Sequence, residues 1–203
     1  MTLYVIVFII ALIRLPLYKD TPLKYLPIIL FITLATEFVG QLLKIGHRDF
    51  IFLIYNIYYF LYFSFFFYVF MKVIDVVSFK KCIKIGLAIF WLVFLGDIVF
   101  SSILKESFII TYIVGAGILI LCIILYYISI LQSSLVLVVK NDLLFWISVG
   151  LFLFYIGYIP IKIIKTWFYK PDSFFEILLI IQFSLIILMY LFFLTGFLWM
   201  KKR

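Results

Sequence analysis

Charged residues are scarce in this 203-residue chain. They make up 13% of it, whereas hydrophobic residues make up 68%. A water-soluble domain needs far more charge on its surface, so this composition excludes a soluble protein and indicates one built for a lipid bilayer. The net charge of +8 does not require a nucleic-acid partner, because basic residues at the rims of membrane helices face anionic lipid head groups. We therefore expect the lipid bilayer, and no nucleic acid, as a partner.

Histidine and cysteine are scarcer still. The one histidine, His47, falls between two apolar stretches, whereas seven-helix zinc hydrolases of the ceramidase type need several histidine ligands. Cys82 and Cys122 are too few for a metal cluster and poorly placed for a disulfide. Small core residues are therefore expected at both cysteine positions.

Recognisable catalytic motifs are also missing. The sequence contains no Gly-x-Ser-x-Gly elbow, no His-Glu-x-x-His and no glycine-rich phosphate loop. The last apolar stretch has no lysine for a retinal Schiff base, and the Pro-Gln pair of small sugar carriers does not occur. We therefore assign no catalytic residue, no metal and no cofactor.

What the chain does have is seven long apolar stretches. We expect helices over residues 2–18, 23–44, 50–73, 82–104, 107–131, 142–165 and 174–200. A helix crosses about 30 Å of hydrocarbon with roughly 20 residues, so seven spans and short connectors account for the length. Runs such as 115–128 are apolar at both odd and even positions, unlike the alternating strands of an outer-membrane barrel. The sequence predicts one all-α domain, residues 1–203, a polytopic bundle of seven transmembrane helices that keeps its first helix.

Lys and Arg residues are distributed unequally between the two sides of this bundle. With the N-terminus outside, 11 of the 17 basic residues lie in cytoplasmic connectors or the C-terminal tail. Cytoplasmic loops of membrane proteins carry the excess of basic residues. The bias predicts an outside N-terminus and a cytoplasmic C-terminus.

Polar side chains inside the predicted helices fall at nearly one depth. On this topology six of them lie roughly 8–12 Å below the outer boundary of the hydrocarbon, counting 1.5 Å per residue. They are Glu37, Asn56, Asp97, Tyr112, Tyr158 and Gln182. Four more, Gln41, Tyr59, Ser101 and Tyr155, lie three or four residues from one of these and share its helix face. These ten residues form our candidate pocket for a ligand or ion in the outer half of the bundle.

Glu37 and Asp97 stand out within this layer, because an intramembrane carboxylate is costly unless it is paired, protonated or hydrated. Lys105, Lys162 and Lys165 are the cations that could reach them. One interpretation is a site that opens to the outside and binds a ligand or ion. The alternative is structural, with the polar groups holding helices together by hydrogen bonds. The sequence leaves both open.

Three short motifs resemble a known group of proteins. They are Lys140 to Gly157, which includes Phe145-Trp146-Ile147-Ser148-Val149-Gly150, then Glu37-Phe38-Val39-Gly40, and Tyr55-Asn56. They are similar to a loosely defined, largely uncharacterised group of small bacterial seven-helix membrane proteins, some associated with sensor histidine kinases. This resemblance implies a sensor-like protein of the bacterial inner (cytoplasmic) membrane.

These observations favour a receptor-like or sensor-like membrane protein that signals through a separate protein partner at the cytoplasmic face or within the membrane. The signal is expected to leave through the connectors 72–84 and 131–141 and the tail. One alternative is an accessory or effector subunit embedded in a larger complex. A small transporter or a lipid-acting enzyme is the third.

Overall fold

The computed structural model describes residues 1–43, 48–104, 106–133, 139–168 and 173–200, with the side chains of residues 48 and 49 left out. Helices occupy most of these residues, and no strand occurs among them. The elements are α1 (Thr2–Tyr18), the 3₁₀ turn η1 (Pro22–Tyr25), α2 (Leu26–Leu43), α3 (Arg48–Val73), α4 (Val77–Phe100), α5 (Ile109–Leu131), α6 (Leu143–Trp167) and α7 (Ser173–Trp199). The predicted all-α class is confirmed.

Six of the helices are long and apolar enough to cross a membrane by length and composition, namely α2 to α7. The α1 helix is shorter, at 17 residues. Long apolar helices suit a bilayer because every backbone polar group inside them is bonded within the helix. The chain therefore forms a multi-pass bundle of membrane type.

The bounds of α4 differ most from the prediction. This helix begins at Val77 and ends at Phe100, whereas 82–104 was expected. It begins early because Val76 is extended and its carbonyl oxygen accepts from the Lys80 amide, so the predicted connector 72–84 shrinks to residues 74–76. It ends early because Ser101 is extended, with φ −125° and ψ 158°.

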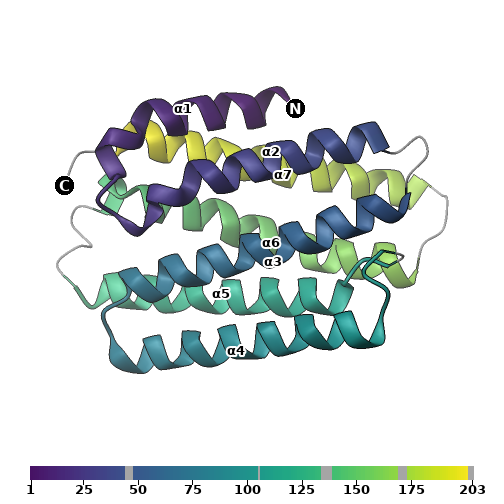
Figure 1. The fold of residues 1–203 in the computed structure, drawn as a ribbon. Coiled ribbons are helices and arrows are strands. Elements are labelled where there is room, and N and C mark those ends of the chain that lie inside the picture. Colours follow the sequence, from purple (N-terminus) through teal and green to yellow (C-terminus); the bar gives the residue numbers. More distant parts are fainter. Residues whose placement is uncertain (44–47, 105, 134–138, 169–172, 201–203) are drawn as a thin grey trace.

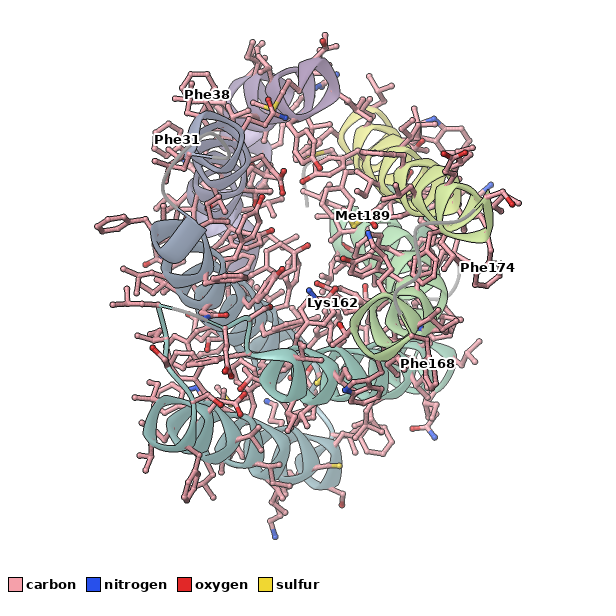
Figure 2. All side chains as sticks on the ribbon, turned by 90° about the vertical axis from the view of Figure 1, so that its right-hand side faces the viewer. Phe31, Phe38, Lys162, Phe168, Phe174 and Met189 are labelled. Atoms are coloured by element: carbon pink, nitrogen blue, oxygen red, sulfur yellow. The ribbon has the colours of Figure 1, made fainter. Side chains whose placement is uncertain are left out.

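Six helices form a closed ring. Around it α1 packs against α2, α2 against α3, α3 against α5, α5 against α6, α6 against α7, and α7 against α1. The α4 helix packs outside the ring, against α3 and α5 (Figures 1 and 2). Helices α2 and α6 therefore lie on opposite sides of the ring.

One half of the ring is filled by aromatic side chains. Phe66, Phe67 and Phe70 in the second half of α3 are fully buried, as is Phe197 near the end of α7. The α6 and α7 helices approach closely, since a Cβ atom added at Gly150 would lie 2.8 Å from the Met189 carbonyl oxygen. The bundle is therefore closely packed at the end where α3 and α7 finish.

Candidate functional site

A cavity of about 720 Å³ lies inside the ring at the opposite end, where α3, α5 and α7 begin. We call this the cavity end of the bundle. Figure 2 looks onto this end, with Lys162 near the centre of the ring. Every helix of the ring contributes to the wall, whereas α4 contributes nothing. The cavity volume falls within the range of roughly 300–1,000 Å³ typical of small-molecule sites.

Seven of the ten predicted pocket residues line this cavity. They are Glu37 and Gln41 on α2, Tyr59 on α3, Tyr112 on α5, Tyr155 and Tyr158 on α6, and Gln182 on α7. These residues come from five helices, yet the structure brings them around one space. Asn56, Asp97 and Ser101 do not line it. Asn56 and Asp97 instead form hydrogen bonds at the connection between α4 and α5, and Ser101 directly follows α4.

Asn56 is a structural residue, contrary to its place in the predicted pocket. Its side chain is 1% exposed. The Asn56 amide nitrogen donates to the carbonyl oxygens of Ile103 at 3.2 Å and Glu106 at 2.9 Å, and its side-chain oxygen accepts from the Phe108 amide at 3.0 Å. The side chain therefore ties α3 to the backbone between α4 and α5, a non-helical segment whose polar groups need partners.

Asp97 is also a structural residue and not part of the cavity wall. It lies in the last turn of α4, and its carboxylate accepts from the Thr111 hydroxyl at 2.7 Å and the Thr111 amide at 3.2 Å. It thus holds the first turn of α5, where backbone N–H groups lack partners inside the helix. Ser101 follows the end of α4, and its amide donates to the Asp97 carbonyl oxygen at 2.9 Å. The expected grouping of Asp97 with Glu37 in one pocket is corrected, because α4 lies outside the ring.

Tyrosine dominates the polar lining of the cavity. Nine of the chain's 15 tyrosines line it. The five that were not predicted as pocket residues are Tyr4, Tyr55, Tyr58, Tyr62 and Tyr190. Their rings are packed, with centroids 4.6 Å apart for Tyr4 and Tyr190 and 4.8 Å apart for Tyr59 and Tyr112.

The sequence did contain a signal for the tyrosines of α3. Tyr55, Tyr58, Tyr59 and Tyr62 follow the i, i+3, i+4, i+7 spacing of one helix face. All four line the cavity. Tyrosine combines an apolar ring with a polar tip, which suits the wall of a cavity reached by a polar molecule.

Lys162 supplies a positive charge to the cavity wall. Its ammonium nitrogen lies 5.6 Å from the centre of the Tyr112 ring and 5.9 Å from that of Tyr59, within the range of a cation–π contact. It makes no ion pair with any residue that the structure describes. Lys165, one turn further along α6, donates to the Gln182 side-chain oxygen at 3.0 Å.

Glu37 supplies the negative charge from the opposite helix, α2. Its side chain interacts with that of Tyr55 on α3. The Tyr55 hydroxyl also packs against Gly40, where an added Cβ atom would lie 2.8 Å away. The cavity therefore has an acidic side chain on α2 and a basic one on α6, on opposite sides of the ring.

No family model, curated protein or solved structure matches this chain. Among the described residues, no group of three His, Cys, Asp or Glu side chains is placed to hold a metal ion. The fold and the site together define the chain as a multi-pass, all-helical protein of membrane type with a polar, tyrosine-lined cavity at one end.

Proposed function

We propose that the protein is a receptor-like or sensor-like membrane protein, which binds a small ligand in this cavity and passes a conformational change to a separate protein partner. The cavity carries the proposal. It is large enough for a small molecule, and it combines apolar rings with a few polar groups and two opposite charges.

The two alternatives receive less support from the geometry. If polar residues served only to hold helices together, they would bond to neighbouring helices, as Asn56 and Asp97 do. Seven of the predicted residues line an open space, although two of them, Gln182 and Glu37, also contact a side chain on a neighbouring helix. A transporter needs a route to the other side, and the far half of the ring is filled by buried residues such as Phe66, Phe67 and Phe70. Binding without passage agrees best with this arrangement.

The aromatic core offers a packed connection from the cavity to the opposite end of the bundle. Tyr112 and Tyr155 on the cavity wall contact Phe63, with ring centroids 5.7 Å and 5.6 Å away. Two turns along α3, Phe70 contacts Tyr126 at 5.6 Å. A displacement of the cavity wall would thus shift side chains near the connector between α5 and α6. Residues packed this densely respond to one another's displacement rather than moving alone.

The proposed orientation places the cavity end outside, with the partner at the cytoplasmic face or within the membrane. It rests on the excess of basic residues at the opposite end. In a bacterial inner membrane, a cysteine introduced at Glu106 should react with an impermeant maleimide from outside. A cysteine at Lys80 should react only after the membrane is opened. The reverse labelling pattern would turn the cavity toward the cytoplasm.

The binding proposal is tested by plugging the cavity. Ser107 lines the cavity and lies in the connector between α4 and α5, so the larger side chain of Ser107→Trp should occupy part of the cavity. Ser102→Trp is the matched control, since Ser102 is exposed in the same connector and does not line the cavity. Native mass spectrometry of protein purified gently from its own membrane should show a bound small molecule in the wild type and in Ser102→Trp. The Ser107→Trp variant should lose it. No bound species in any of the three, or equal occupancy in both variants, would contradict the proposal.

A further inference from the structure

The cavity opens sideways toward the membrane as well as toward the end of the bundle. Three residues of α7, Leu179, Phe183 and Ile187, line the cavity and are also solvent-exposed, by 41%, 62% and 51%. They are four residues apart and so follow one stripe of the helix. On α2, across this gap, Gln41 combines the same two properties. We call this gap the lateral opening.

The arrangement of the helices explains the lateral opening. Helices α2 and α7 are not neighbours in the ring, because α1 lies between them. The first turn of α1 meets α7 where Tyr4 packs on Tyr190. Figure 1 shows α2 and α7 continuing beyond the N-terminal end of α1 toward the cavity end. Along that stretch, which includes Leu179 to Ile187, the described residues leave the wall incomplete.

Lys162 marks where a charged group would lie inside. Its ammonium group points into the cavity, beside two tyrosine rings, and no described residue forms an ion pair with it. A cation removed from bulk water is stabilised by an anion, and a ligand carboxylate or phosphate would supply one.

The depths of these groups match the shape of an amphiphile. Lys162 lies five residues before the last residue of α6, or about 7 Å along the helix axis. The α7 stripe lies 6 to 14 residues beyond Ser173, or roughly 9–21 Å along α7. A head group at Lys162 would thus be near the membrane surface, with its hydrocarbon chain extending deeper past Phe183 into the lateral opening.

We propose that the cavity takes a single-chain amphiphile with an anionic head group, which enters from the bilayer between α2 and α7. This inference rests on the proposed function and specifies its ligand class. The head group binds Lys162, and the chain lies along the stripe of Leu179, Phe183 and Ile187.

The test uses full-length protein in nanodiscs of zwitterionic phospholipid, with a palmitate probe carrying a diazirine on its chain. Its uncharged counterpart is the alcohol with the same chain and diazirine. After illumination, adducts of the palmitate probe should map to Leu179–Ile187 of α7 and be displaced by unlabelled palmitate. The alcohol should label this stripe at least tenfold less.

Variants at two lysines make the test specific. Lys162→Met should lower labelling by palmitate about tenfold, whereas Lys162→Arg should keep most of it, because arginine retains the charge. Lys165→Met is the matched control on the same helix, since Lys165 bonds to Gln182 and does not line the cavity. Its labelling should stay within twofold of wild type. A loss of labelling in Lys165→Met as large as in Lys162→Met would overturn the role of Lys162.

A second probe, a lysophosphatidic acid with the same photoreactive chain, distinguishes the two sources of the anion. Whichever probe labels more strongly, the phosphate or the carboxylate, identifies the preferred head group, and either result supports the proposal. Equal labelling by palmitate and alcohol, unchanged in Lys162→Met, would overturn it, because that pattern describes ordinary lipid contact. If native mass spectrometry still finds a soluble molecule that Ser107→Trp removes, the amphiphile fails while the proposed binding function stands. If neither experiment finds an occupant, both the amphiphile proposal and the proposed binding function are refuted.

Discussion

Replacement of Asn56 tests whether this residue holds the fold or serves the cavity. Asn56→Leu keeps a side chain of similar size and removes all three hydrogen bonds that the amide makes to the segment between α4 and α5. The carbonyl oxygens of Ile103 and Glu106 and the amide of Phe108 then lose their partner. The site is buried, so water does not readily replace it.

The size of the effect follows from the number of bonds. Each net hydrogen bond is worth about 1 kcal/mol, so Asn56→Leu should lower the free energy of unfolding by about 3 kcal/mol. Asn56→Asp should cost at least about 3 kcal/mol, because its carboxylate still accepts from the Phe108 amide but places a buried negative charge against the two carbonyl oxygens. Unfolding in mixed micelles by titration with sodium dodecyl sulfate measures both values.

Asn141→Leu provides the matched control. Asn141 is half-buried near the start of α6, and its side chain makes no hydrogen bond to the residues that the structure describes. This variant should stay within about 0.5 kcal/mol of wild type. If Asn56→Leu were equally harmless, the three bonds would contribute nothing to stability. If it kept full stability but lost the cavity's occupant, Asn56 would belong to the binding site after all.

Three further predictions concern other parts of the bundle. Glu37→Gln should keep the unfolding free energy within about 1 kcal/mol of wild type. It should change the occupancy of the cavity, as measured by native mass spectrometry. If stability and occupancy fell in proportion, Glu37 would be structural. Asp97→Ala should lower the free energy of unfolding by about 1–3 kcal/mol, because it removes the acceptor at the start of α5. Ligand binding per folded molecule should stay unchanged. A selective loss of binding would contradict the structural role of Asp97. Gly150→Ala should weaken the packing of α6 on α7 and lower the melting temperature, because its Cβ atom would meet the Met189 backbone. Gly117→Ala is the control, because its Cβ atom has open space and the change should be neutral or slightly stabilising. Equal melting temperatures of the two variants would refute the close contact at Gly150.

Much of the candidate site could be predicted from the sequence, because depth in a membrane follows from counting residues. Glu37, Tyr112, Tyr158 and Gln182 come from four helices, and all line one cavity as their similar depth suggested. Asn56 and Asp97 lie near the same end but form hydrogen bonds outside the cavity. Counting along a helix gives the height of a residue, whereas the direction of its side chain depends on the rotation of the helix.

The sequence by itself determined the class of fold and the positions of the helices. Apolar runs of about 20 residues leave their backbone no stable choice in lipid other than a helix, so length and composition suffice. The α4 helix ends four residues before the predicted position, because the side chain of Asn56 on another helix holds the following segment in a non-helical form. Such a tertiary contact leaves no local pattern in the sequence.

Only the tertiary structure decided which helices form the ring and which side of each helix faces inward. In a soluble protein an apolar stripe would reveal the inward face, but these helices are apolar on all sides because lipid and core are both hydrocarbon. The position of α4 outside the ring removed Asp97 from the cavity, and the rotation of α6 brought Lys162 into it. The gap between α2 and α7 likewise depends on where α1 meets α7, a packing contact that arises only when the helices assemble.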